Sequence, residues 1–405
     1  MDSNMRSIVL SLYLPTLILS FAAGMLTPIM PLYALSFDIS YALVGVVLAA
    51  QGTGNLIGDI PAGILLGKLG HKWSMLIGVG TLGLATLAVS WAQTVPELVL
   101  YGLAAGIGNS MWNISRHAYM TDLIPLAKRG RISATFGGIN RIGAFAGPAV
   151  GGMLGVAYGL RFPIMIFAGV TLIALILSAL FVNESVAPRT RRGGVRGHTG
   201  HLLHIMRTYA GIFSTAGVAQ LLAQMIRTGR NSIIPLYAAD VVGLDLEAIG
   251  WIVTLSAAID LAMFYPAGVI MDRYGRKYAS VPSFLLQGIG MALVPLSSTF
   301  GGLLMATLVI GFGNGIGSGT LLTLGSDLAP KDSMGEFLGV WRLIGDVGQT
   351  GAPLAVGGVA DLVGLAMSTL VMAGVGLAAA AVLGLLVPET LQRPVTIVAK
   401  PSPGD

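Results

Sequence analysis

Eight charged side chains stand inside stretches of sequence that are otherwise apolar enough to cross a membrane. A charge in hydrocarbon is costly, so these side chains are expected to face one another or a water-filled cavity. A carboxylate placed there can take up and release a proton, and a guanidinium can hold an anion. Binding and proton exchange are therefore the chemistry that these residues favour. They are Asp59, Arg116, Arg141, Arg227, Arg230, Asp260, Arg342 and Asp346.

Asp260 is the first candidate for a carboxylate that couples to protons. Arg227 and Arg230 lie at comparable depth on the preceding apolar stretch, and consecutive helices are expected to be neighbours in space. Arg141 is a further partner that we expect to meet Asp260 across an interface between helices. Protonation of Asp260 would release whichever cation it holds.

Asp59 and Asp346 are the second candidates for proton coupling. Arg342 and Asp346 are four residues apart, so on a helix they are expected to satisfy each other as a pair. Asp59 is expected to reach Arg342 from another helix. A pair between Asp59 and Arg342 would hold two parts of the molecule together like a gate.

Polar side chains recur at helical spacing on several of the apolar stretches. Positions i, i+4 and i+7 share one face of a helix, and within a membrane that face must meet polar partners or water. Two interpretations stay open, a substrate cavity or hydrogen bonds that hold helices together. The cavity candidates are Asn109, Asn113, Arg116, Arg141, Gln220, Gln224, Arg227, Arg230, Asn231, Asn314 and Arg342.

The composition indicates an integral membrane protein that positions these residues on helices. Hydrophobic residues make up 54% of the chain and charged residues 10%, whereas a soluble domain carries about 25% charge. Apolar stretches long enough to cross a bilayer predict twelve transmembrane helices. They lie near 8–36, 42–67, 73–93, 96–121, 132–159, 162–182, 209–238, 247–271, 278–298, 300–326, 337–360 and 364–387.

Basic residues are concentrated in alternate loops between these stretches. The positive-inside rule therefore predicts a multi-pass protein of the cell (inner) membrane with both termini in the cytoplasm. It also accounts for the net charge of +5 without nucleic acid as a partner. The basic residues on the predicted cytoplasmic side include Lys68, Lys72, Lys128, Arg129, Arg131, Arg273, Arg276, Lys277 and Lys331.

The second half of the chain repeats the first at an offset of 205 residues. The segment PAGILLGKLGHK at 61–72 returns as PAGVIMDRYGRK at 266–277. Such repeats predict two pseudo-symmetric bundles with a site between them. We expect six-helix bundles at 1–182 and 208–389, a cytoplasmic linker at 183–207 and a cytoplasmic tail at 390–405. The repeat mate of Arg116 is Leu321, so that cation is present in one half only.

With its repeat and its loops, the chain resembles the major facilitator superfamily. The loop GVIMDRYGRK, 268–277, matches the cytoplasmic loop signature of that family, in which Asp and Arg residues latch neighbouring helices and Gly275 permits a tight turn. The first copy has Gly67 in place of the Asp and His71 in place of an Arg. The resemblance thus implies an intact latch between spans 5 and 8 and leaves that between spans 2 and 11 open.

A second motif, GAFAGPAVGG at 143–152, resembles the antiporter signature of drug–proton carriers in this superfamily. Its proline bends the helix and its glycines permit close contact with a neighbour, so helix packing is the alternative interpretation. The residues with expected conformational roles are Gly63, Gly67, Gly70, Gly268, Asp272, Arg273, Gly275, Arg276, Gly143, Gly147, Pro148, Gly151 and Gly152.

The sequence contains no motif that is typical of a cofactor or metal site. Cysteine is absent, and neither a Walker loop nor an HExxH pattern occurs, so we expect no cofactor, no metal site and no enzymatic activity. The expected partners are a small-molecule substrate, protons and the lipid bilayer around a monomer.

The resemblance implies a secondary active transporter that works by alternating access. Proton-coupled export of a small lipophilic or amphiphilic compound, as in multidrug efflux, is the first hypothesis. A symporter or exchanger of a small organic anion is the alternative, favoured by five intramembrane Arg against three Asp. A receptor or scaffold that uses the carrier fold without transporting is the third.

Overall fold

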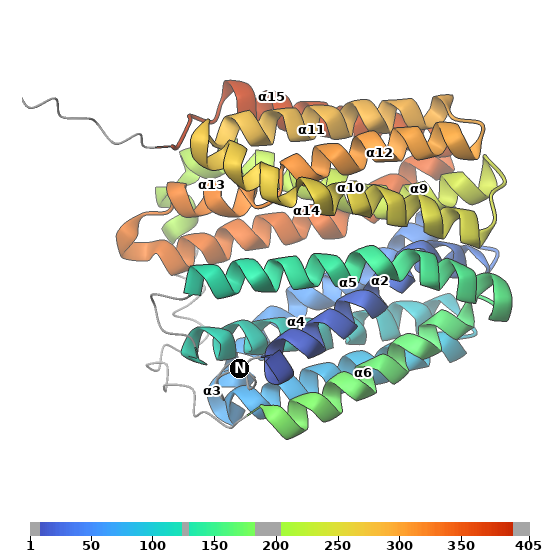
Figure 1. Ribbon diagram of the computed structural model, residues 1–405, viewed down its shortest axis with the longest axis horizontal. Coiled ribbons are helices and arrows are strands. Elements are labelled where there is room, and N and C mark those ends of the chain that lie inside the picture. Colours follow the sequence, from blue (N-terminus) through green and yellow to red (C-terminus); the bar gives the residue numbers. More distant parts are fainter. Residues whose placement is uncertain (1–8, 124–128, 183–203, 392–405) are drawn as a thin grey trace, which may run out of the picture.

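The computed structural model of this chain is a bundle of helices that run along its longest axis (Figure 1). It describes residues 9–123, 129–182 and 204–391, without the side chains of 123 and 129–134. Every regular element within these ranges is helical and none is a strand. The predicted all-α class is confirmed.

The first half contains six spans. A π-helical turn, η1 (Val9–Tyr13), runs into α2 (Leu14–Leu35). α3 (Tyr41–Trp91) is 51 residues long, but Gly70 at φ 80° interrupts it, so it comprises two spans. The others are α4 (Val95–Leu123), α5 (Arg129–Tyr158) and α6 (Arg161–Phe181).

The second half repeats this arrangement with different interruptions. α8 (Ala210–Ile212) and η3 (Phe213–Gly217) lead into α9 (Val218–Asp240), which is followed by α10 (Leu246–Arg273). α11 (Arg276–Leu293) ends in η4 (Val294–Leu296). The next span is broken into α12 (Phe300–Ile316) and α13 (Thr320–Leu328). After η5 (Lys331–Ser333) come α14 (Met334–Val363) and α15 (Leu365–Leu385).

Twelve spans can be traced in the described residues, as the sequence predicts. Seven helices are long and apolar enough to cross a membrane by length and composition alone, and α3 is one of them. α4, α5, α9 and α14 have 29, 30, 23 and 30 residues. They carry six of the eight intramembrane charges, so they are more polar than the others because they are shielded from lipid.

The two halves meet along two main pairs of helices. α3 packs on α14 and α5 packs on α10, with α2 against α9 between them. In Figure 1 the blue-to-green half lies below the yellow-to-red half. These two pairs are related by the repeat, because spans 2 and 11 correspond to spans 8 and 5. The exact domain limits stay a prediction, since much of the linker and tail lies outside the described residues.

At one end of the bundle the halves pack backbone against backbone. A Cβ built on Gly250 of α10 would lie 2.6 Å from the carbonyl oxygen of Pro148 on α5, and one built on Gly45 of α3 would collide with the carbonyl of Pro353 on α14. Such close approach is possible only where glycine leaves room. We name the end with the loops that hold Lys72 and Lys277 the basic-loop end. The close backbone contacts are at the opposite end.

Toward the basic-loop end the interface is looser. Gly137 lies one turn from Arg141 on α5, and Gly63 lies one turn from Asp59 on α3, so each faces the other half. A Cβ built on either glycine meets no atom of the described residues within 4 Å. The halves are therefore tight at one end and apart at the other.

Candidate functional site

Asp260 on α10 is bonded to helices of both halves. Its Oδ1 accepts a hydrogen bond from Nη1 of Arg141 on α5 at 2.7 Å, and its Oδ2 accepts one from Nδ2 of Asn314 on α12 at 2.8 Å. The guanidinium of Arg141 also lies over the ring of Phe264, 5.1 Å from its centroid. The side chain of Asp260 is only 16% exposed. A change in its charge would thus be felt by both halves.

The bond from Asn314 to Asp260 has a counterpart in the first half. Nδ2 of Asn109 on α4 donates to Oδ1 of Asn55 on α3 at 3.1 Å, and each of these residues lies 205 positions before its mate. The fold therefore uses an amide–acceptor bond between the second and fourth spans of each half. Only the second copy has a carboxylate as the acceptor. Asn55 was not among the sequence candidates.

Arg342 on α14 lies between two carboxylates. It is 3.7 Å from Oδ1 of Asp59 on α3 and 3.5 Å from Oδ2 of Asp346 one turn along its own helix. Asp59 also accepts a short hydrogen bond from Ser110 on α4. Because Arg342 is 49% exposed, this cluster lies at a wet edge of the interface.

Arg227 and Arg230 lie on α9, and the hydrogen bond and the aromatic contact of Arg227 are both within the second half. Nη2 of Arg227 donates to the carbonyl oxygen of Gly317 at 2.9 Å, and its guanidinium lies over Phe284 at 5.2 Å. Gly317 stands where α12 ends, and its carbonyl oxygen also accepts hydrogen bonds from the backbone N–H and the hydroxyl of Thr320, so the cation adds a third donor at the break. Neither arginine has a carboxylate within ion-pairing distance in the described part of the chain.

Two other candidates on α9 act as packing groups. Gln220 is 4% exposed, and its amide lies 2.6 Å from the position that a Cβ on Gly345 of α14 would take. Gln224 touches the same position from the next turn at 3.4 Å. These contacts match the interpretation of the amides as groups that hold helices together.

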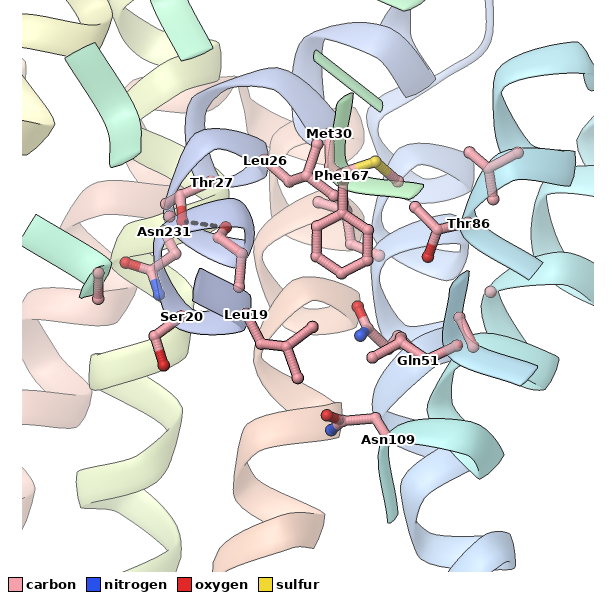
Figure 2. A pocket seen from close by; sticks show the side chains of 18 of the residues that line it. Leu19, Ser20, Leu26, Thr27, Met30, Gln51, Thr86, Asn109, Phe167 and Asn231 are labelled. Carbon is pink, nitrogen blue, oxygen red and sulfur yellow. Dashed lines mark hydrogen bonds between the residues drawn. The ribbon is translucent and has the colours of Figure 1, made fainter. Parts of the chain in front are cut away.

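A cavity of about 480 Å³ opens between α2, α3, α4, α5, α6, α9 and α14. In Figure 2 the amides of Gln51, Asn109 and Asn231 surround the side chains of Leu19 and Phe167. Most of its wall comes from the first half. Among the predicted residues, Asn109, Asn113, Arg116 and Asn231 line it.

The predicted cavity residues thus do not all line this one cavity. Arg141, Gln220, Gln224, Arg227, Arg230, Asn314 and Arg342 do not line this cavity. The polar wall residues Ser20, Gln51, Thr86 and Asn140 were not predicted. A single Ser, Thr or amide residue in an apolar stretch does not reveal from the sequence whether it lines a cavity, because that depends on which helix faces it.

Arg116 lies in the wall of this cavity and is 6% exposed. One Nη donates to Oδ1 of Asn113 at 2.7 Å, and the other is 3.5 Å from the hydroxyl of Thr16. The guanidinium faces the rings of Phe136 and Trp112 at 4.5 and 5.5 Å. All these partners are uncharged.

The glycines of 143–152 let α5 approach two neighbours. A Cβ on Gly143 would lie 2.6 Å from the carbonyl oxygen of Leu17 on α2, one on Gly147 2.6 Å from N of Met25, and one on Gly152 3.2 Å from Cα of Gly250 on α10. The packing interpretation of this motif therefore has a direct geometric basis. Because the same motif contacts α2 of its own half and α10 of the other half, a change in α5 would disturb the packing of both helices.

The basic loops repeat one ion pair in two forms. Nε of Arg276 lies 2.8 Å from Asp327, and at the equivalent position Nε2 of His71 lies 3.3 Å from Asp122. The first half thus keeps this contact between a loop and the fourth span of the same half, with histidine in place of arginine. Both loops turn at a glycine of positive φ, Gly70 at 80° and Gly275 at 126°.

The expected latch between spans 5 and 8 has one side that can be described. Asp272 is 76% exposed and lies 3.8 Å from Nη1 of Arg276 in its own loop, while Arg273 lies over Tyr274. The facing segment of α5, 129–134, is outside the described side chains. The latch between these spans stays a prediction.

Glu389, which follows α15, holds the start of α11. Its carboxylate accepts hydrogen bonds from the backbone N–H groups of Arg276 and Lys277, each at 2.9 Å, and from those of Thr390 and Leu391. Partial burial alone would raise the pKa of Glu389, but these four donors outweigh it and hold the pKa below its usual value.

Two repeated six-helix halves with a cavity between them are the architecture of membrane carriers that move solutes by rocking one half against the other. The family model described as Major Facilitator Superfamily matches the chain twice, at residues 12–219 and 216–403. The chain belongs to the major facilitator superfamily, and it is a transporter rather than an enzyme.

Known proteins resemble the chain over most of its length. It is 27% identical over 352 residues to multidrug resistance protein MdtH of Aeromonas hydrophila, covering 83% of this chain and 82% of that protein. It is 23% identical over 360 residues to a Na(+), Li(+), K(+)/H(+) antiporter of Planococcus maritimus, covering 81% and 84%. The structure of a D-xylose–proton symporter matches with a TM-score of 0.75 at 19% identity, over 96% and 99% of the two chains. That structural likeness shows the fold alone.

Proposed function

We propose that this transporter exports a small lipophilic or amphiphilic compound in exchange for protons, by alternating access. The observation that carries the proposal is the bond network of Asp260, a buried carboxylate held by Arg141 of the first half and Asn314 of the second. A group that joins both halves and can lose its charge is what coupling requires.

Protonation of Asp260 would weaken the contact between α5 and α10. A neutral acid no longer attracts the guanidinium of Arg141, whereas the bond from Asn314 stays within the second half and is kept. A proton can shift only an equilibrium in which its affinities for the two states differ. Loss of the pair between Arg141 and Asp260 is the step that we propose to link proton uptake to the rocking of the two halves.

The packing at the two ends supports an inward-open form. The positive-inside rule assigns the basic-loop end to the cytoplasm, and there a Cβ built on Gly63 or Gly137 meets no described atom within 4 Å. At the other end Gly250 and Pro148 are in backbone contact. A rocking motion would close the first end and open the second, which moves the cavity from one side to the other.

Export rather than uptake is inferred from two supports. The cavity wall is largely apolar, with side chains such as Leu19, Met30 and Phe167, which suits an amphiphilic compound. MdtH is named a multidrug resistance protein and the Planococcus maritimus protein a cation–proton antiporter. We propose a monomer in the cell membrane with both termini in the cytoplasm.

The test is a transport assay on purified protein in proteoliposomes. A panel of lipophilic cations, neutral dyes and organic anions is measured with and without an imposed pH gradient. We expect the gradient to drive accumulation of at least one class on the side that supplies protons. Equal movement of every transported compound under both conditions would contradict proton coupling.

An exchanger of organic anions is the second function. Arg116 in the cavity wall favours it, because this cation has no carboxylate at ion-pairing distance among the described residues. Anion-for-anion exchange without any effect of the pH gradient would support this alternative over the first.

A further inference from the structure

The feature that the proposed function leaves unexplained is the buried cation of Arg116. It is 6% exposed, lines the cavity and faces two aromatic rings. Within the described residues it has no carboxylate at ion-pairing distance. A buried charge without a partner of opposite sign is destabilising, so a ligand that neutralises Arg116 would remove a cost that the fold alone leaves in place.

The guanidinium has donors to spare. Its Nε has no hydrogen-bond partner among the described residues, and of its two Nη groups one bonds Asn113 at 2.7 Å while the other has only a contact of 3.5 Å with Thr16. A guanidinium offers five N–H donors in a planar fork that matches a carboxylate. Nε is itself covered by protein atoms, so it is the two Nη groups, each with one N–H left unbonded among the described residues, that can bind a ligand.

The fold itself does not require a cation at this position. The repeat mate of Arg116 is Leu321 on α13, which is 4% exposed and belongs to the apolar core of the second half. Among the other intramembrane arginines, Arg141 and Arg342 have carboxylate partners. Arg227 and Arg230 have none among the described residues, but they do not line this cavity. The cation of Arg116 is thus present where a cavity replaces that core.

We propose that Arg116 binds the negative charge of the transported compound, which makes that compound an organic anion with an apolar body. The inference rests on the proposed function and names its substrate class. The acid group binds the free donors of Arg116 beside Asn113. The apolar body lies against Leu19, Leu26, Met30 and Phe167. A cavity of about 480 Å³ is within the usual range of about 300–1,000 Å³ for small-molecule sites.

The experiment measures binding, without any gradient, to purified protein in nanodiscs. Three carboxylate probes of increasing length (benzoate, phenylbutyrate and phenyloctanoate) are each compared with the matching neutral amide by calorimetry. We expect at least one carboxylate to bind more tightly than its amide, by about tenfold to a hundredfold, as a hydrogen-bonded charge predicts. Carboxylates and amides that bind equally, or three carboxylates that do not bind, would overturn the proposal.

Variants assign the effect to Arg116. Arg116→Gln should remove the preference for the carboxylate, and Arg116→Lys, which keeps the charge but not the fork, should keep part of it. Arg161→Gln is the matched control, because Arg161 lies at the far end of the bundle and does not line this cavity. An Arg116→Gln protein that folds and keeps the full preference would contradict the assignment. If Arg116→Gln fails to fold, the Arg116→Lys variant and the carboxylate-to-amide ratio of the native protein decide.

The outcome is independent of proton coupling. A protein that prefers carboxylates but transports without a response to pH would keep this inference and lose the proposed coupling. A protein whose transport responds to the pH gradient but that binds carboxylates and amides equally would keep the proposed coupling and lose this inference.

Discussion

Nη1 of Arg141 lies 2.7 Å from Oδ1 of Asp260, and this bond crosses the boundary between the two halves of the transporter. The equivalent position to Asp260 in the first half is Asn55, which accepts the same bond from Asn109 but carries no charge. The hydrogen bond between the second and fourth spans is therefore present in both halves, but only the second half has a carboxylate in it. A proton that binds here acts on one of the two interfaces, α5 with α10, and not directly on the other.

The cluster around Arg342 should tolerate the loss of one carboxylate. Either Asp59→Asn or Asp346→Asn leaves Arg342 with its other partner, so each single variant should lower stability by about 1 kcal/mol or less and retain gradient-driven transport. The double variant leaves the cation unpaired and should cost more than the sum. Thermal unfolding in detergent together with uptake measures both effects. A single variant that abolishes transport would make that residue a coupling site.

Gly275 and Gly268 should respond in opposite directions to alanine. Gly275 has φ 126°, and a Cβ there would lie 2.5 Å from the carboxylate of Glu389, so Gly275→Ala should destabilise the protein by at least about 1–2 kcal/mol. Gly268 is helical, and a Cβ on it meets nothing within 4 Å, so Gly268→Ala should be neutral or stabilising by up to about 1 kcal/mol. Thermal unfolding of both variants checks this. Equal destabilisation would show that the loop does not depend on the turn at Gly275.

Glu389 should make stability depend on pH. Because its pKa is lowered in the folded state, its contribution is fully present above the usual glutamate value of about 4.3 and is lost as the pH falls through the lower folded-state value. Glu389→Gln should therefore melt at a lower temperature than the native protein near neutral pH. The gap should narrow as the medium becomes more acidic than about pH 4. A gap that is constant over that range would mean that the charge of Glu389 is not what stabilises α11.

The spans and the partner of Asp260 could be predicted from the sequence because they depend on strong signals. Twelve apolar stretches and the repeat define the spans, and a few charges in hydrocarbon leave few possible pairs. Arg141 is one of three arginines predicted as partners of Asp260, and it is the one that pairs among the described residues, whereas Arg227 and Arg230 do not. The contact between His71 and Asp122 was harder to predict, because the family motif has an arginine there. Comparison with Arg276 and Asp327 at the repeat offset would have suggested it.

The position of the cavity could not be predicted, for a physical reason. Helical spacing tells which residues share a face, but the rotation of each helix in its bundle depends on packing against neighbours. Gln220 and Asn113 look alike in sequence, yet one packs against Gly345 and the other lines the cavity. Arg227 likewise turns to Gly317 because α12 breaks there, and the glycine-rich run GNGIGSG at 313–319 is the only hint of that break.

The most direct test of the proposed mechanism is transport by the Asp260→Asn variant in proteoliposomes. Asparagine can keep a hydrogen bond with Asn314 but can neither take up a proton nor pair with Arg141 as an anion. We predict that the variant loses transport driven by a pH gradient and keeps substrate binding and exchange in the absence of a gradient. Asp346→Asn, measured in parallel, should keep gradient-driven transport. Gradient-driven transport by Asp260→Asn at the native rate would contradict the assignment of Asp260 as the coupling site.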